Sequence, residues 1–212
     1  MAVVVDLGRR RYREVWELQA QTLEDRIHDR VDDTVFLVEH DPPVYTLGRK
    51  AGARQNLLDA GGAEVIEVER GGDVTWHGPG QLVAYPICKL EGAQRDLHAW
   101  LRALEQVAID TVGAFGLRGE RDPRNTGVWA NGRKLASIGI ACRRWVTWHG
   151  LALNVHPDLE WFRRARPCGL DAGLLTSMAA ELGTPPDGTA VRRALAERLA
   201  TLNAPLDNDP RP

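Results

Sequence analysis

The chain has 212 residues, 43% of them hydrophobic and 26% charged, which is the composition of a globular protein with a sizeable core. Its formal net charge of −2 disfavours a dedicated nucleic-acid binder, because such proteins usually carry a basic surplus. The sequence contains no apolar run of about 18 residues, so we expect neither a membrane span nor a membrane partner. The N-terminal apolar run is too short for a signal peptide. Three cysteines without a CxxC pair suit free thiols, and we expect a cytoplasmic protein.

The first part of the chain predicts strands interrupted by one long helix. We expect a short buried strand at 2–6 and then an amphipathic helix that ends near Asp29, because apolar residues recur there at helical spacing. Further strands are expected at 34–40 and 44–47. The segment 65–69 alternates apolar and acidic residues, as a half-buried strand does.

The second part of the chain predicts hairpins with helices before and after them. Asn131-Gly132 separates two strand candidates and is a strong hairpin signal, while Asp96 can cap the helix that follows it. The expected strands are 82–87, 127–130, 134–140 and 145–155, and the expected helices are 97–112, 174–182 and 189–202. This order predicts an α+β fold with a mixed or mainly antiparallel sheet. We expect one domain over 1–204, with 174–202 as a possible C-terminal appendage, and a disordered tail at 205–212.

The segment 70–81 holds four glycines and one proline in twelve residues, which predicts a loop and not the interior of a strand or helix. It also contains Arg70, Trp76 and His77, and strand candidates flank it on both sides. A loop of this kind on a rigid frame suits ligand binding. The alternative is a glycine-rich connection that binds nothing.

Two residues are candidates for chemistry. Cys168 lies between Pro167 and Gly169 on a predicted turn, and nearby arginines would favour its thiolate, although a structural cysteine is the alternative. Lys134 begins a strand directly after a tight turn. Its ammonium either points inward, where a thiolate would be a suitable partner, or faces solvent. We interpret Cys88 and Cys142 as small core residues.

A metal site is not expected. His77, His149 and His156 lie in glycine-bearing segments, but the chain has no HExxH motif and no paired CxxC. Gly150 and Ala152 leave space beside the strand candidate at 145–155. That space suits a slot for an apolar ligand, and ordinary core packing explains it equally well.

Four motifs occur in order in the chain: Arg70-Gly71-Gly72 with His77-Gly78-Pro79-Gly80-Gln81; Gly127-Val128-Trp129 with Lys134 and Ser137-Ile138-Gly139; Trp145-Val146-Thr147 with His149-Gly150 and Ala152-Leu153-Asn154-Val155; and Pro167-Cys168-Gly169. Together they closely resemble the LipB family, the octanoyl-[acyl-carrier-protein]:protein N-octanoyltransferases of lipoate biosynthesis. Asp73, Trp76 and Ala84 depart mildly from the usual motif, and the carboxylate of Asp73 leaves the contacts of the loop open.

The resemblance implies a biotin/lipoate protein ligase fold, a mixed sheet flanked by helices, with the glycine-rich loop over an acyl pocket. It implies a catalytic pair, Cys168 and Lys134. It also implies a set of substrate-binding residues: Arg70, Gly71, Gly72, Asp73, Val74, Thr75, Trp76, His77, Ser137, Ile138, Gly139, Gly150, Leu151 and Ala152.

The implied activity transfers an octanoyl group from octanoyl-acyl carrier protein to a lysine of a lipoyl domain, through an acyl thioester on Cys168 and without a cofactor. The implied acceptors are the lipoyl domains of 2-oxoacid dehydrogenase complexes and the glycine cleavage H protein. One alternative is an ATP-dependent lipoate or biotin ligase of the same fold, and another is a non-catalytic module that binds acyl carrier. We expect a docking rim for acidic partners, formed by Arg124, Arg133, Arg143, Arg144, Arg163, Arg164 and Arg166.

Overall fold

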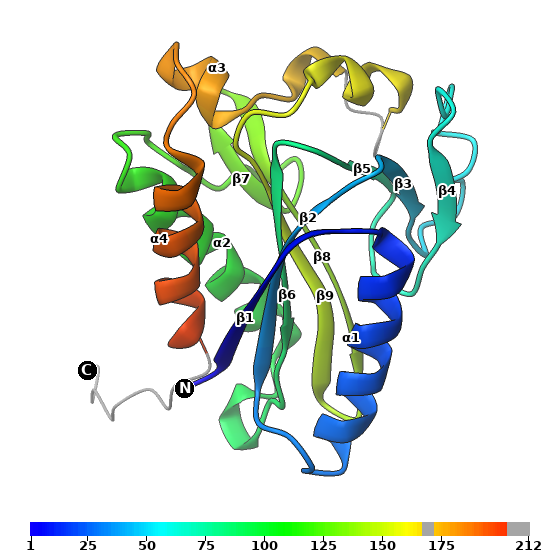
Figure 1. The fold of residues 1–212 in the computed structure, drawn as a ribbon, viewed down its shortest axis with the longest axis vertical. Coiled ribbons are helices and arrows are strands. Elements are labelled where there is room, and N and C mark those ends of the chain that lie inside the picture. Colours follow the sequence, from blue (N-terminus) through cyan, green and yellow to red (C-terminus); the bar gives the residue numbers. More distant parts are fainter. Residues whose placement is uncertain (167–171, 203–212) are drawn as a thin grey trace.

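The computed structural model describes residues 1–166 and 172–202, which form two β-sheets with helices around them (Figure 1). The larger sheet has six strands in the order β1-β2-β6-β9-β8-β7. Their bounds are β1 (Val3–Arg10), β2 (Thr34–His40), β6 (Gln81–Ile87), β9 (Val146–Asn154), β8 (Arg133–Arg143) and β7 (Gly127–Ala130). β1 and β2 pair in parallel and the other neighbours are antiparallel, which confirms the predicted mixed sheet.

The smaller sheet has three strands in the order β4-β3-β5. Its bounds are β3 (Val44–Leu47), β4 (Glu64–Glu67) and β5 (Val74–His77). The strand β5 corrects the prediction of a continuous loop over 70–81, because Val74–His77 pairs antiparallel with β3. The glycines lie on either side of these four residues, so a β-branched and aromatic stretch is left free to form a short strand between them.

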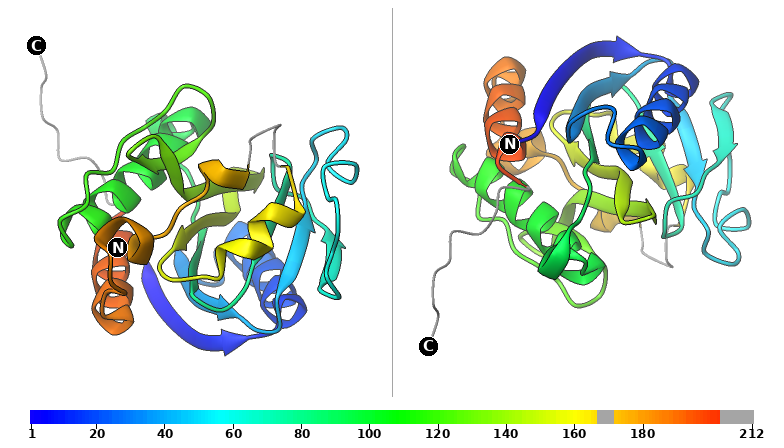
Figure 2. Two further views of the ribbon diagram at one scale, coloured as in Figure 1. Left: turned by 90° about the horizontal axis from the view of Figure 1, so that it is seen from above. Right: turned by 90° about the horizontal axis from the view of Figure 1, so that it is seen from below.

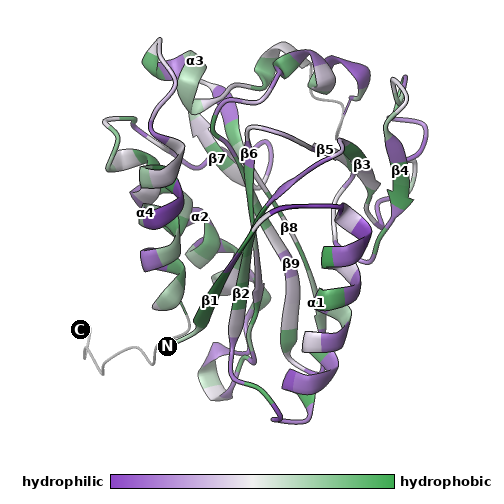
Figure 3. Ribbon diagram, in the orientation of Figure 1, coloured by the Kyte–Doolittle hydropathy of each residue, from purple (hydrophilic) through white to green (hydrophobic). Residues whose placement is uncertain are grey.

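Alternating side chains give the larger sheet two apolar faces. Val35 and Leu37 of β2 belong to one core cluster, whereas Phe36 and Val38 belong to the other. The helices α2 (Leu97–Gly113) and α4 (Gly188–Ala200) cover the first face, and α1 (Tyr12–Ile27) covers part of the second (Figure 2). Figure 3 shows the resulting pattern, with hydrophobic strands inside and hydrophilic residues on α1 and α4.

Two local signals in the sequence are confirmed. Asn131 and Gly132 have φ values of 50° and 73° in the turn between β7 and β8, the positive values that a two-residue hairpin requires. The carboxylate of Asp96 accepts hydrogen bonds from the backbone N–H groups of His98 and Ala99, so it caps α2.

The C-terminal part differs from the prediction in two ways. A helix was expected from residue 174, but α3 spans only Met178–Leu182, since Ser177 caps it and Leu175 forms a β-bridge with Lys134. The helix α4 is no appendage: Val191, Leu195 and Leu199 are fully buried in the core that α2 also contacts. In the chain as far as it is described, no helix has both the length and the apolarity to cross a membrane. The expected tail at 205–212 lies outside the described residues, and the extent of the domain stays a prediction.

Candidate active site

A cavity lies between the second face of the larger sheet and the glycine-rich segment. All the residues predicted to bind substrate line it, and so does Lys134. Its floor contains two facing pairs on neighbouring strands, Ser137 opposite Ala152 and Gly139 opposite Gly150. The small side chains of Ser137 and Ala152 leave space where larger residues would fill the core. The two glycines instead allow close approach of neighbouring backbone, because an added Cβ would lie 3.0 Å from the Gly71 oxygen at Gly139 and 2.4 Å from the Ala84 oxygen at Gly150.

The glycine-rich segment forms the opposite wall and is held firmly. The buried guanidinium of Arg70 donates to the backbone oxygen of Thr46 at 2.9 Å and to the Thr46 hydroxyl at 2.8 Å. The Gly71 N–H donates to the Ile140 oxygen of β8 at 2.8 Å, which ties the wall to the floor. At Gly48, an added Cβ would lie 2.3 Å from the Gly72 oxygen, so the neighbouring chain passes too close for any side chain.

Asp73 adds a buried anchor to this wall. Its carboxylate accepts hydrogen bonds from the Asn56 amide and the Val74 N–H, both at 2.7 Å, and it lies 3.2 Å from the Lys50 ammonium. The sequence left the contacts of the Asp73 carboxylate open, and these are the contacts that it makes. Asp73 fastens the wall to the segment around Asn56, because a buried carboxylate is stable only when hydrogen-bonded or paired.

Buried imidazoles lie at one end of the cavity: His77 and His149 line it, and His40 contacts the lining residue Tyr85. The Nε2 atom of His40 lies 2.7 Å from the Tyr85 hydroxyl, and burial lowers the pKa of His40 to about 4. His77 donates from Nδ1 to Gln81 Oε1 at 2.7 Å, and burial holds its pKa well below the usual value. Burial also lowers the pKa of His149, whose Nε2 lies 3.5 Å from Glu69 Oε2. The imidazoles at this end are therefore neutral near pH 7.

The burial of His40 predicts a pH dependence of stability. Below its unfolded pKa of about 6.5 the unfolded chain binds a proton that the folded chain excludes, so stability falls as the pH drops from 6.5 towards 4. We expect His40 to account for a loss of about 2 kcal/mol between pH 7.5 and pH 5. Urea unfolding of the wild type and His40→Gln at both pH values measures this as a smaller pH-linked loss in the variant. His98→Gln, at an exposed position, is the matched control and should behave as the wild type; an unchanged pH dependence in His40→Gln would contradict the prediction.

Lys134 is buried, which excludes the solvent-facing alternative. Its Nζ donates a hydrogen bond to Asn125 Oδ1, and both residues line the cavity. The Lys134 backbone oxygen accepts a hydrogen bond from the Thr176 N–H at 2.9 Å, so the backbone at the start of β8 is fixed by the segment before α3. A buried amine beside a cavity is suited to proton transfer, because a lysine can release its proton and an arginine cannot.

Comparison with known proteins shows which family this chain belongs to. Residues 11–200 match the family model of the lipoyl protein ligase A/B catalytic domain. The chain belongs to this family. An octanoyltransferase of Gloeobacter violaceus is 52% identical over 169 residues, covering 79% of this chain and 76% of the relative. An octanoyltransferase of Geobacter metallireducens is 46% identical over 200 residues, covering 94% and 92%. These relatives confirm the resemblance to the LipB family.

Solved structures of the wider lipoyl and biotin ligase group share the fold. A bipartite lipoate protein ligase from Thermoplasma acidophilum superposes with a TM-score of 0.70 at 14% identity, covering 95% of this chain and 83% of that chain. A biotin protein ligase from Aquifex aeolicus, solved with biotin and ATP, gives 0.59 at 10% identity, covering 95% and 70%. The predicted biotin/lipoate protein ligase fold is thus confirmed.

Cys168, the second member of the catalytic pair that the family resemblance predicted, lies outside the described residues. The described chain on either side of 167–171 lies against the cavity, since Ala165 and Leu175 both line it. The Arg166 N–H donates to the Asn56 oxygen at 2.8 Å, next to the Asp73 anchor. The role of Cys168 stays a prediction.

Other sequence candidates lie away from the cavity. Cys88 is fully buried in the core, Cys142 is half-buried, and burial raises the pKa of both thiols. Neither lines the cavity, and His156 is exposed outside it. Within the described residues, no three His, Cys, Asp or Glu side chains gather in a group that could hold a metal ion.

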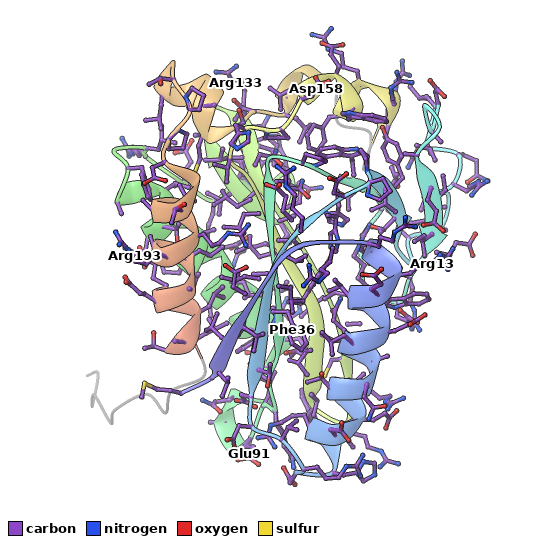
Figure 4. The ribbon with its side chains drawn as sticks, in the orientation of Figure 1. Arg13, Phe36, Glu91, Arg133, Asp158 and Arg193 are labelled. Atoms are coloured by element: carbon purple, nitrogen blue, oxygen red, sulfur yellow. The ribbon has the colours of Figure 1, made fainter. Side chains whose placement is uncertain are left out.

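The expected arginine rim is wrong for Arg143 and Arg144. Lys134 and Arg143 are nine positions apart on one strand, about 30 Å at the rise of a β-strand. Figure 4 shows the two ends of the molecule, with Arg133 at the end where β8 begins and Glu91 at the opposite end. The turn after β8 lies near Glu91, because the Leu90 N–H donates to the Trp145 oxygen, and Arg143 pairs with Glu24 of α1.

The sequence did not point to several residues of the site. Val83 and Tyr85 lie on the cavity side of β6, and strict alternation along that strand was the signal that would have found them. Asn125, two residues before the Gly127-Val128-Trp129 motif, gave no local signal, because only the fold brings it to Lys134. Also missed were Tyr12, Tyr45, Phe162, Ala165 and Leu175.

Proposed function

We propose that this chain is an octanoyltransferase, which moves an octanoyl group from octanoyl-acyl carrier protein to a lysine of a lipoyl domain, the first step of endogenous lipoate biosynthesis. The observation that carries the proposal is the buried Lys134 at a cavity lined by the motif residues of the family. Relatives named octanoyltransferase, 43–52% identical to this chain, support the same acyl group.

The cavity suits a short acyl chain. Its apolar lining includes Val74, Trp76, Ile138 and Leu151, and the small side chain of Ala152 lies in its floor. Burying about seven chain carbons at about 0.8 kcal/mol each supplies roughly 5 kcal/mol of binding free energy. Burial keeps the lining imidazoles of His77 and His149 neutral, so these two side chains place no charge of their own against an uncharged hydrocarbon tail.

The first half-reaction forms an acyl-enzyme. The Cys168 thiolate attacks the thioester carbonyl carbon, a new C–S bond forms, and the bond to the carrier sulfur breaks. Lys134 gives a proton to the departing carrier thiolate, which leaves as a thiol. The product is an octanoyl thioester on Cys168.

The second half-reaction transfers the chain to the acceptor. The lysine amine of a lipoyl domain attacks the thioester carbonyl, the C–S bond to Cys168 breaks, and an amide forms. Lys134, now neutral, takes the proton that the attacking nitrogen loses, and the Cys168 thiolate returns. No cofactor enters either step. The proposed acceptors are the lipoyl domains of 2-oxoacid dehydrogenase complexes and the glycine cleavage H protein.

Docking and compartment follow from the same proposal. Arg124, Arg133, Arg163, Arg164 and Arg166 remain as the proposed rim for acidic partners at the end of the molecule where β8 begins. A cytoplasmic location fits, because a reducing compartment keeps the Cys168 thiol free. The proposal takes residues 1–204 as one catalytic domain.

Intact-mass spectrometry after mixing with octanoyl-acyl carrier protein tests the function. We expect one octanoyl adduct, mapped to Cys168, that disappears when a lipoyl domain is added while the domain gains the same mass. Saturable binding of the carrier without an adduct would indicate a binding module. Efficient modification of the lipoyl domain with free octanoate and ATP, and no carrier, would indicate an ATP-dependent ligase.

A further inference from the structure

The side chain of Lys134 packs over Gly127 on its way to the cavity. Gly127 begins β7 with φ 140°, and an added Cβ there would lie 2.8 Å from Lys134 Cε and 2.3 Å from the Ala136 oxygen. The absence of a side chain at Gly127 therefore lets the lysine stem lie flat against the strand. At the end of that stem, Nζ meets the Asn125 amide oxygen.

The position of Asn125 is itself fixed from two sides. The indole N–H of the fully buried Trp129 donates to the Asn125 backbone oxygen at 3.2 Å. Two residues on, the Gly127 N–H donates to the buried carboxylate of Glu105 at 3.1 Å. Glu105 also accepts from Arg121 at 3.0 Å, which fastens the start of the same loop to α2.

We propose that Asn125 is a positioning residue for Lys134: its amide oxygen holds the Lys134 amine in place at the cavity while leaving its proton transferable. This inference rests on the proposed octanoyl transfer. A carboxylate in the same place would favour the charged ammonium and retain its proton. An amide accepts a hydrogen bond without taking a charge, so Asn125 gives and takes no proton in either half-reaction.

The surroundings of Lys134 are consistent with this division of roles. Glu181 of α3 has a buried carboxylate that pairs with Arg133 at 2.8 Å and accepts a hydrogen bond from the Asn131 amide at 2.7 Å. Asp73 is engaged by Asn56 and Lys50. Among the described residues, the other ionisable side chains that line the same cavity are Tyr12, Tyr45, Arg70, Asp73, His77, Tyr85 and His149.

Steady-state kinetics of three variants test the proposal. Asn125→Ala should lower kcat about tenfold or more with KM for the carrier changed less than about threefold, because the amine is misplaced but the pocket is intact. In Asn125→Asp, the midpoint of the rise of kcat with pH should lie about one unit higher than in the wild type, since the new carboxylate keeps Lys134 protonated. Asp122→Asn, in the same loop but outside the cavity lining, should match the wild type, because an amide oxygen can still accept from the Arg124 N–H.

A second measurement tests the role of Asn125 separately from the proposed octanoyl transfer. The pH dependence of Lys134 modification by an amine-reactive reagent, followed by peptide mass mapping, requires no octanoyl transfer. It should shift upward in Asn125→Asp even if the wild type proves to transfer a different acyl group. An unshifted labelling profile in Asn125→Asp, or wild-type kcat in a folded Asn125→Ala, would overturn the proposal. If Asn125→Ala does not fold, Asn125→Ser, which retains a small acceptor, replaces it.

Discussion

Replacing Lys134 with alanine is expected to lower octanoyl transfer by about a thousandfold, the range in which a general acid–base group acts. Both half-reactions lose their proton carrier, and the buried amine has no substitute at the start of β8. Lys134→Arg should be nearly as poor, because a guanidinium retains the charge but cannot release the proton. Transfer from octanoyl-acyl carrier protein to a lipoyl domain, measured by mass spectrometry, gives the rate for each variant.

Lys89→Ala is the matched control for this experiment. Lys89 pairs with Asp29 outside the cavity, its ammonium donating to Asp29 Oδ1 at 2.7 Å, so its loss should leave transfer unchanged. A folded Lys134→Ala variant that transfers octanoyl within tenfold of the wild type would refute the assigned role. A loss in Lys134→Ala that Lys134→Arg fully restores would show that charge alone is required.

Filling the floor of the cavity should change which acyl chain is accepted. At Gly139 an added Cβ would lie 3.0 Å from the Gly71 oxygen and 3.3 Å from Arg70 Cδ, both on the opposite wall. Because the wall is this close, the methyl groups of Gly139→Val have to turn along it into the adjoining cavity, and displacing two methylenes at 1–3 kcal/mol each predicts a loss of octanoyl transfer of about a hundredfold. Butanoyl carrier should lose much less, so the octanoyl-to-butanoyl rate ratio should fall at least about tenfold.

Gly113→Ala is a suitable control for a glycine substitution, because an added Cβ there meets no atom within 4 Å. It should leave both rates unchanged. Equal losses for butanoyl and octanoyl in Gly139→Val would contradict the prediction, since they would indicate a distorted wall and not a shortened cavity. Thermal unfolding of the variant distinguishes that distortion from a local block.

Several elements followed from local chemistry alone. The Asn131-Gly132 turn and the Asp96 cap depend on neighbouring residues only, and both have the predicted contacts. The bounds of Thr34–His40 and Val44–Leu47 also agreed with the prediction, because the β-branched and apolar runs there end at Asp41-Pro42 and at Gly48. The strand Val74–His77 escaped prediction since its partner, β3, is distant in sequence.

The sequence by itself determined the family, the mixed α+β architecture and the motif residues that line the cavity, because these are carried by motifs whose members lie close together in the chain. Only the tertiary structure decided that Lys134 is buried, that the Asn125 amide oxygen accepts a hydrogen bond from the Lys134 amine and that Asp73 anchors the glycine-rich wall through Asn56. It also decided that α4 belongs to the core and that Arg143 and Arg144 lie far from the site. The reason is physical: burial and charge pairing depend on which distant segments the sheets bring together, and no local pattern encodes that contact.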